Sequence, residues 1–179
     1  LMETDAGHTE VFGLVDEERK LNLDTAPEAV LQRLLQEAGG VREDEARQAA
    51  EAIADWRDSD TDQRPNGAED FYYLNLRDSY ECKDGPFENV EELLLVKGMS
   101  PELFANIAAY LTVHGSGRVN LNTASPVVLR ALGLSDEGIN GIVFYRAGED
   151  NREGTADDRA FSSLSAINAE LAQFVPKED

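Results

Sequence analysis

The chain contains the stretch Leu21-Asn-Leu-Asp-Thr-Ala-Pro-Glu-Ala-Val-Leu-Gln-Arg-Leu34, and the pattern returns as Val119-Asn-Leu-Asn-Thr-Ala-Ser-Pro-Val-Val-Leu-Arg-Ala-Leu132. Seven of the fourteen aligned positions are identical. Each copy predicts a short extended piece followed by a helix, because Thr or Ser is a good N-cap and proline suits the first helical turn. An internal repeat of this kind indicates two copies of one small helical unit.

The spacing of apolar residues predicts further helices outward from the repeat. We expect them over residues 43–57 and 89–96, and from Ser100, Ser135 and Ser163 onward. Strand candidates are few, and we place them at residues 10–15, 20–23 and 118–121, the first two as a possible hairpin. The chain is therefore predicted to be α+β and mainly helical, with short helices in hairpins and a small sheet.

Composition excludes several classes of function. The chain has 179 residues, with 16 Lys and Arg against 36 Asp and Glu, a net charge of −20. Such a charge opposes wide contact with nucleic acid or with anionic lipid, since both are held largely by Lys and Arg. Cys82 is the single cysteine, which excludes an intrachain disulfide. No run of apolar residues is long enough to span a bilayer, and no catalytic motif is evident.

The segment Asp58-Ser-Asp-Thr-Asp-Gln-Arg-Pro-Asn-Gly-Ala-Glu69 carries the sharpest chemical signal. Its carboxylates stand at the loop positions by which an EF-hand wraps Ca²⁺, although Gln63 replaces the expected glycine. Oxygen donors without His or Cys suit Ca²⁺ better than zinc or copper. We predict a calcium loop that is not a true EF-hand, and the alternative is a solvated acidic loop. The candidate ligands are Asp58, Asp60, Asp62, Arg64 (through its backbone carbonyl), Glu69 and Asp70.

Two other features have less specific interpretations. The acidic segment Glu149–Asp158 lacks regular ligand spacing, so we expect a flexible surface loop and leave a second metal open. Trp56 and the run Phe71-Tyr-Tyr73 are expected to pack in the core, and an exposed patch for a partner is the alternative.

The second copy of the repeat resembles the helix-hairpin-helix modules of competence-type DNA-binding proteins. In that family the hairpin carries Gly-x-Gly, whose amides hold phosphate. Here the hairpin is Leu132-Gly-Leu-Ser135 with one glycine, and Asp136 and Glu137 follow at once. DNA binding is therefore kept as the alternative function, with a scaffold that can be shared without the activity.

Taken in order, the motifs of the whole chain resemble the K-type minor pseudopilins of bacterial type II secretion (the GspK family), over about residues 11 to 175. The resemblance rests on many separate motifs that occur in the family's order. They are Gly13-Leu-Val-Asp-Glu-Glu-Arg-Lys-Leu-Asn-Leu-Asp-Thr-Ala26, Asp55-Trp-Arg-Asp-Ser-Asp60, Gly67-Ala-Glu-Asp-Phe-Tyr-Tyr73, Gly85-Pro-Phe-Glu-Asn-Val-Glu-Glu-Leu-Leu-Leu-Val-Lys-Gly-Met99, Leu111-Thr-Val-His-Gly-Ser-Gly-Arg-Val-Asn-Leu-Asn-Thr-Ala124 and Tyr145-Arg146.

The resemblance implies a pilin-like small sheet that carries a large inserted helical domain of helix-hairpin-helix or SAM-like type. By that pattern, residues 1–23 supply strands of the pilin-like core, residues 24–113 the inserted domain with its calcium loop, and residues 114–179 the second helical repeat and the return to the core. It also implies calcium in the helical part and no enzymatic activity. The expected role is a subunit of the pseudopilus tip, together with minor pseudopilins of the I and J types. The expected location is the periplasm, with an inner-membrane anchor supplied by an N-terminal helix that this chain lacks.

Overall fold

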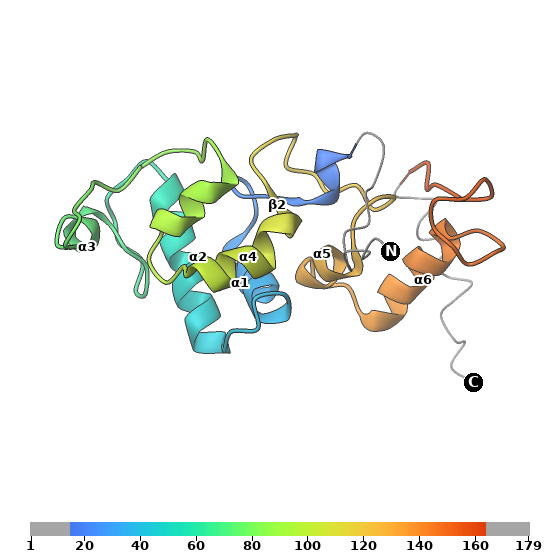
Figure 1. Ribbon diagram of the computed structural model, residues 1–179, viewed down its shortest axis with the longest axis horizontal. Coiled ribbons are helices and arrows are strands. Elements are labelled where there is room, and N and C mark those ends of the chain that lie inside the picture. Colours follow the sequence, from blue (N-terminus) through green and yellow to red (C-terminus); the bar gives the residue numbers. More distant parts are fainter. Residues whose placement is uncertain (1–14, 164–179) are drawn as a thin grey trace, which may run out of the picture.

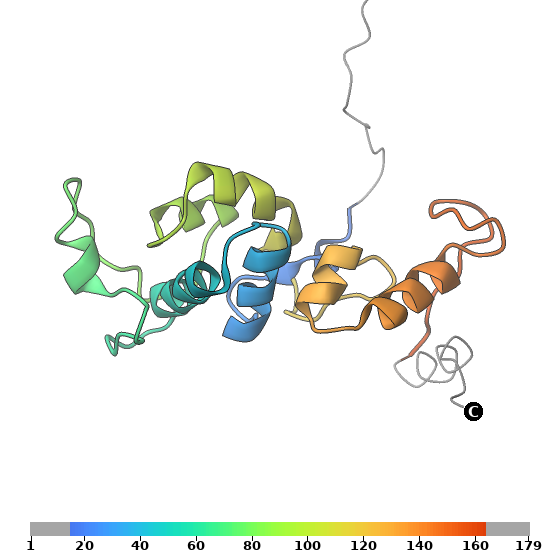
Figure 2. The same ribbon diagram turned by 90° about the horizontal axis from the view of Figure 1, so that it is seen from below.

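The computed structural model describes residues 15–163, which form an elongated body with helices on both sides of a small sheet (Figures 1 and 2). The mainly helical composition and the small sheet confirm the predicted fold class. The elements are η1 (Glu17–Arg19), β1 (Leu21–Asn22), α1 (Glu28–Glu37), α2 (Glu43–Arg57), α3 (Asp70–Tyr73), η2 (Val90–Leu95), α4 (Pro101–Ile107), η3 (Ala108–Tyr110), β2 (Leu111–Thr112), α5 (Pro126–Ala131) and α6 (Asp136–Arg146).

Several helix starts follow the signals in the sequence, but α1 begins after Pro27 without a side-chain cap, so the expected Thr cap of the first repeat is wrong. Ser100, Ser125 and Ser135 are the N-caps of α4, α5 and α6, and each side chain accepts a hydrogen bond from a backbone amide of the first turn. Asn89 and Glu92 form a capping box at the start of η2. The helix that is expected from Ser163 lies outside the described residues.

The sheet differs from the prediction. It has two parallel strands of two residues each, with Leu21 opposite Leu111 and Asn22 opposite Thr112. The prediction of a strand at residues 118–121 is wrong. In this segment the Asn120 amide donates a hydrogen bond to the Glu18 carbonyl of η1 (2.7 Å), and the chain then turns. Residues 10–14 lie outside the described part, so the expected hairpin stays a prediction, as do the domain boundaries at 23/24 and 113/114.

The two copies of the repeat adopt the same turn before their helices. The Ala26 amide donates to the Asn22 carbonyl and the Ala124 amide to the Asn120 carbonyl, both at 2.9 Å. In each copy the asparagine side chain also accepts from the amide two residues later, at 2.9 and 3.0 Å. The sequence repeat is therefore a structural repeat, in which each turn leads into a pair of helices.

An arginine at the end of the second helix closes each copy. The Arg57 guanidinium, at the end of α2, donates to the Ala26 carbonyl (2.8 Å) and to the carbonyl three residues before it. Arg146, at the end of α6, makes the corresponding bonds to Ala124 (2.7 Å) and to the carbonyl three residues before it (3.2 Å). These donors satisfy buried carbonyls that no strand or helix would otherwise pair.

Helix α1 connects the two copies. It packs against α2 within its own copy and against α5 of the other, and the three helices lie side by side in both ribbon views (Figures 1 and 2). Leu31, Leu34 and Leu35 of α1 are each about 1% exposed and belong to one continuous hydrophobic core. The core includes Trp56 and so fixes the C-terminal end of α2. The acidic segment that begins at Asp58 follows directly.

Candidate metal site

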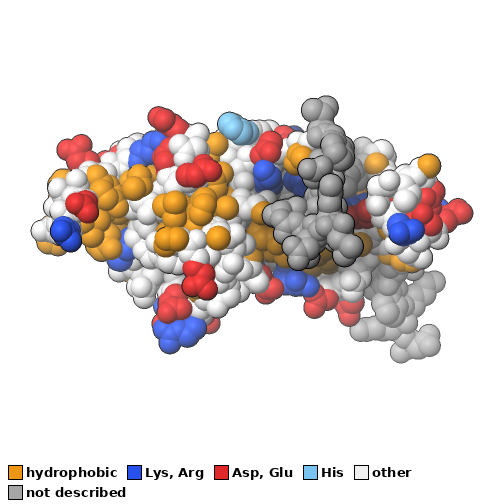
Figure 3. Space-filling model, viewed as in Figure 1, with side chains coloured by type: hydrophobic (Ala, Val, Ile, Leu, Met, Phe, Trp, Pro, Cys, Tyr) orange, Lys and Arg blue, Asp and Glu red, His pale blue; other side chains and the backbone are white. Residues whose placement is uncertain are grey.

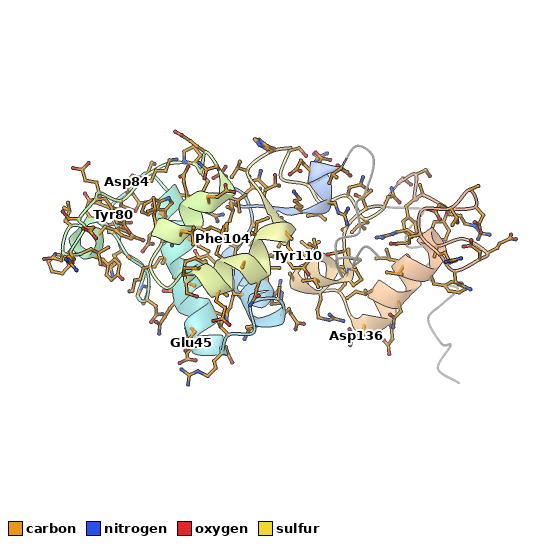
Figure 4. The ribbon with its side chains drawn as sticks, in the orientation of Figure 1. Glu45, Tyr80, Asp84, Phe104, Tyr110 and Asp136 are labelled. Carbon is orange, nitrogen blue, oxygen red and sulfur yellow. The ribbon has the colours of Figure 1, made fainter. Side chains whose placement is uncertain are left out.

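Carboxylates from three segments meet at the end of the molecule that lies farthest from α6. They come from the last turn of α2, from the residues just before α3, and from the loop that follows Tyr80. Figure 4 labels Tyr80 and Asp84 in this region, and Asp136 at the start of α6 in the other half of the molecule. In the described part of the chain, the grouping that could hold a metal ion is Glu69, Cys82 and Asp84.

Arg64 fixes the acidic residues at the end of α2. Its guanidinium contacts Asp55 (2.7 Å) and Asp58 (2.5 Å), and its Nε donates to Glu28 of α1 (2.8 Å). Asp55 is fully buried, and burial raises the pKa of its carboxyl while the Arg64 guanidinium opposes that shift. The hydrogen bonds from Arg64, above all that to Asp55, raise the pKa of the guanidinium, so the cation is firmly held.

Gly67 allows the loop to approach the Asp55 carboxylate closely. A Cβ at position 67 would lie 1.9 Å from the Asp55 Oδ2 atom, so no other residue fits without a shift of the loop. The Lys97 ammonium donates to the Gly67 carbonyl (2.9 Å) on the other side. Together these contacts place the next residues, Ala68 and Glu69, in the interior.

Four buried carboxylate oxygens at this site have no hydrogen-bond partner among the described residues. They are both Oε atoms of Glu69, Oδ1 of Asp58 and Oδ1 of Asp84. Glu69 is the most deeply buried of the three residues, with an exposure of 5%. A buried carboxylate without donors is costly, and a bound cation is one way in which proteins offset that cost.

The crowding shifts the titration of Glu69. Burial raises the pKa of Glu69 to about 7; the Cys82 thiol opposes this shift, and the charges of Asp55, Asp84 and Asp58 add to it. These carboxylates therefore lie close enough to repel one another in the absence of a cation. The Cys82 thiol, 7% exposed, lies among them, and burial raises its pKa to about 12.

The structure brings some of the predicted ligands together and leaves others apart. Glu69 lies in the grouping with Cys82 and Asp84, whereas Asp58 lies outside it and acts on Glu69 through its charge. Asp70 lies beside the grouping, where its Oδ1 accepts from the Cys82 amide (2.7 Å). Asp60 and Asp62 are exposed, and Asp60 accepts from the Asp62 amide (2.9 Å).

The Arg64 carbonyl, the remaining predicted ligand, accepts from the Gly67 amide (3.1 Å). Asp84 is absent from the ligands that the sequence predicts. It lies fifteen residues after Glu69 in an irregular loop, where its backbone has a φ of 48°. The following Gly85 indicates a turn, but nothing in the sequence indicates that Asp84 is a ligand. The cluster is therefore assembled by tertiary folding rather than by loop spacing.

The donor set fits a hard divalent cation. Asp58, Glu69 and Asp84 offer buried oxygen atoms that lack donors, and Ca²⁺ takes such carboxylates in flexible geometry. Their combined negative charge would be largely neutralised by one such ion, which would also remove the mutual repulsion that raises the pKa of Glu69.

The second acidic loop, 149–158, satisfies its own carboxylates. Asp157 Oδ2 accepts from the Glu149 amide (2.6 Å) and the Asp150 amide (3.1 Å), and Asp158 accepts from the Gly154 amide (2.7 Å). The Thr155 hydroxyl and these amides lower the pKa of Asp157. The loop lies on the surface, as expected, and its backbone amides bind Asp157 and Asp158, while Arg146 and Arg159 pair with Glu153 and Glu149.

The aromatic residues beside the site divide between core and surface. Trp56 and Tyr73 pack edge to face with ring centroids 5.1 Å apart, and both are buried, which confirms that part of the prediction. Phe71 is 81% exposed, so the expectation that it packs in the core is wrong. A helix of four residues makes a single turn and can bury only one of its sides. In α3 the buried side carries Tyr73, so Phe71 is exposed.

Further apolar side chains are exposed on the same half of the molecule. They are Leu74, Leu94 and Leu95, and Figure 3 shows hydrophobic side chains gathered over the half that carries α2 and α4.

The hairpin between α5 and α6 presents acid rather than base. Asp136 and Glu137 occupy the first turn of α6, and Asp136 pairs with Arg130 (2.7 Å). Gly133 has φ of +94° and lies against the Arg33 side chain. Phosphate would meet carboxylates at this helix start, which disfavours the DNA-binding alternative.

Comparison with known proteins gives one consistent family. The family model for protein K of the type II secretion system matches residues 10–116. The type II secretion system protein K of Aeromonas hydrophila is 37% identical over 106 residues, which cover 56% of this chain and 32% of that protein. The protein of the same name from Pseudomonas aeruginosa is 30% identical over 138 residues, or 76% of this chain and 40% of that protein.

The fold also matches a solved structure. A chain in the crystal structure of the GspK-GspI-GspJ complex from enterotoxigenic Escherichia coli aligns with a TM-score of 0.68 at 20% identity, over 90% of this chain and 59% of that one. The chain thus spans between about a third and three fifths of the length of the proteins it matches. Within residues 15–163, none of the helices combines the length and the apolar character that crossing a membrane requires.

Proposed function

Because the chain belongs to the type II secretion system protein K family, we propose that it is part of a minor pseudopilin that acts as a non-enzymatic subunit at the tip of the pseudopilus. In this proposal it assembles with minor pseudopilins of the I and J types to cap or initiate the filament for protein export. Its place is the periplasm, with an inner-membrane anchor in the full-length protein. The proposal is supported most directly by the family match over residues 10–116.

The surface of the chain is compatible with an assembly role. Phe71, Leu74, Leu94 and Leu95 expose apolar side chains, and exposed apolar groups of this size are common at protein contacts. The net charge of −20 opposes association of identical copies, because like charges repel. The apolar side chains offer a contact surface, and the net charge favours partners of a different kind over self-association.

The assembly proposal is tested with purified proteins. The chain is mixed with the soluble domains of the I-type and J-type pseudopilins from the same organism, and the mixture is examined by size-exclusion chromatography with light scattering. We expect a complex that contains one copy of each protein. Separate elution of this chain at concentrations where the other two associate would contradict the proposal.

We also propose that Ca²⁺ binds at the carboxylate cluster, with Asp58, Glu69 and Asp84 as ligands and Asp70 holding the Cys82 segment in place. This is supported by the four buried oxygen atoms that lack hydrogen-bond donors. Asp60, Asp62 and the Arg64 carbonyl remain ligands predicted from the loop spacing, and they would join the ion after a movement of the loop toward the cluster. The ion would tie the end of α2 to the start of α3 and to the loop at 82–84.

A further inference from the structure

The Cys82 thiol is a part of the cluster that the calcium proposal does not use. One ligand atom each of Glu69, Cys82 and Asp84 lies within 4.8 Å of the others. Calcium takes oxygen ligands, so it would bind the two carboxylates and leave the thiol protonated. A thiolate, in contrast, is a preferred ligand of zinc and of other borderline or soft metal ions.

We propose that Glu69, Cys82 and Asp84 form a mixed thiolate and carboxylate site for a thiophilic divalent cation of the Zn²⁺ class. Asp58, which contributes a buried oxygen atom without a donor, is the fourth ligand available nearby. This site shares its carboxylates with the calcium proposal but does not depend on it, and it is independent of the role in the pseudopilus.

The geometry suits a small ion with few ligands. Zinc is bound at about 2.0–2.3 Å by four ligands in a tetrahedral arrangement, so its ligand atoms lie roughly 3–4 Å apart. The three atoms in the structure are already within 4.8 Å of one another, and small rotations of the side chains would close the remaining gap. Glu69 is only 5% exposed, and both of its carboxylate oxygen atoms lack hydrogen-bond partners. The Cys82 thiol is the group near enough to donate to it, and a bound metal would take the place of that proton.

The charge balance also favours a divalent ion. When the metal binds, the Cys82 S–H bond breaks, a sulfur–metal bond forms, and the proton passes to solvent, so no electron transfer is involved. The thiolate, Glu69 and Asp84 then carry three negative charges, which one divalent ion reduces to a net charge of −1. The Cys82 amide remains bound to Asp70 Oδ1 (2.7 Å), which holds the sulfur near the carboxylates.

Cobalt provides the test, because Co²⁺ replaces zinc and gives a near-ultraviolet charge-transfer absorption when a thiolate is bound to it. The full chain, freed of metal with a chelator, is titrated with Co²⁺ and then with Zn²⁺. We expect the absorption to appear with one equivalent of Co²⁺, to disappear when Zn²⁺ displaces it, and to be lost in Cys82→Ser and strongly weakened in Glu69→Gln. Asp136→Asn, at the far end of the molecule, is the control that should keep the absorption.

The outcomes separate the mixed site from the calcium proposal. Co²⁺ binding without the thiolate absorption, or an absorption that Glu69→Gln leaves unchanged, would overturn the mixed site. Cys82→Ser is also tested for stabilisation by Ca²⁺, which checks that the variant folds, since calcium needs the carboxylates alone. If Ca²⁺ stabilises the parent chain but Co²⁺ gives no thiolate absorption with it, the mixed site is refuted. The calcium proposal is then still supported.

Discussion

Arg64 shows how single residues make an acidic site possible at all. Its guanidinium forms ion pairs with Glu28, Asp55 and Asp58. Of these three carboxylates, that of Asp55 is fully buried. One cation thus neutralises part of the charge at the end of α2. Among residues 15–163 the Glu69 carboxylate has no hydrogen bond from Arg64, and the thiol of Cys82 is the side chain that lowers its pKa.

Arg64→Met is expected to destabilise the protein strongly, because it leaves the buried Asp55 carboxylate without its partner. Breaking a buried ion pair from one side typically costs about 3–5 kcal/mol. The matched control is Arg42→Met, whose side chain is 73% exposed in its ion pairs and whose loss should cost under about 1 kcal/mol. Urea unfolding measures both, and equal effects would show that the Arg64 pair is not buried in solution.

The raised pKa of Glu69 predicts how stability depends on pH in the absence of metal. The folded state holds a proton on Glu69 up to about pH 7, whereas the unfolded chain releases it near the ordinary value of 4.5. The free energy of unfolding of the metal-free protein should therefore fall as the pH rises between these two values. Glu69→Gln removes this dependence, so its stability should exceed that of the parent chain at pH 8.

Under the proposal that Ca²⁺ binds the ionised Glu69 carboxylate, calcium should reverse that order. With saturating Ca²⁺ at pH 8, the parent chain should be more stable than Glu69→Gln. Thermal unfolding of both proteins, with chelator and with calcium, gives the four values needed. If Glu69→Gln were less stable than the parent in chelator at pH 8, the Glu69 carboxylate would not be buried without a partner in the metal-free protein.

At the scale of elements, two helical copies are joined by contacts between their turns. Asp16 illustrates the joint, because its carboxylate accepts from the Asn120 amide group (2.8 Å) and the Thr123 hydroxyl (2.7 Å) of the second turn while it caps η1. The Thr123 hydrogen bond in particular lowers the pKa of Asp16. Gly117, in the loop before the second turn, packs against Thr25 of the first.

Gly117→Ala is expected to disturb this joint. Its φ is +78°, and a Cβ there would lie 2.4 Å from the Thr25 hydroxyl oxygen. Gly40→Ala is the matched control, since Gly40 has φ of +68° but open space where the Cβ would lie. The left-handed conformation alone costs about 1–2 kcal/mol for a residue with a Cβ, and overpacking adds about 1–3 kcal/mol. Gly117→Ala should therefore be the less stable of the two by urea unfolding, and the reverse order would contradict the packing of the two turns.

The elements differ in how far sequence could predict them. The helix starts could be found because Ser100, Ser125 and Ser135 are local signals that need no tertiary contact. The strands could not be placed well, since β1 and β2 have two residues each and such a length shows no periodicity.

The candidate site likewise combines residues that the sequence predicts with residues that only the folded structure brings together. Asp58 and Glu69 could be found from their spacing, but Cys82 and Asp84 reach them through the folding of a loop with no regular pattern. The exposure of Asp60 and Asp62 is not visible in the loop spacing either, nor are the ion pairs that Arg64 makes with Asp55 and Asp58.

At the scale of the whole molecule, a chain of net charge −20 places several carboxylates in its interior at one end. Repulsion between like charges opposes the compact state, so an acidic protein of this kind gains stability from any cation that binds the folded form alone. The central claim is that the cluster of Asp58, Glu69 and Asp84 binds such a cation and that Ca²⁺ can fill the place. In the proposed assembly with other pseudopilins, this chain would then contribute a domain whose end is held together by an ion.

Thermal unfolding of chelated protein during a titration with Ca²⁺ tests this claim most directly, with Glu69→Gln as the variant and Asp136→Asn as the control. At about 100 times the dissociation constant, binding adds roughly 2.7 kcal/mol, which corresponds to a rise in Tm of roughly 5–10 °C for a chain of this size. We predict a saturable rise of that order in the parent chain and in Asp136→Asn, and its loss in Glu69→Gln. An unchanged Tm in the parent chain, or an equal rise in Glu69→Gln, would contradict the claim.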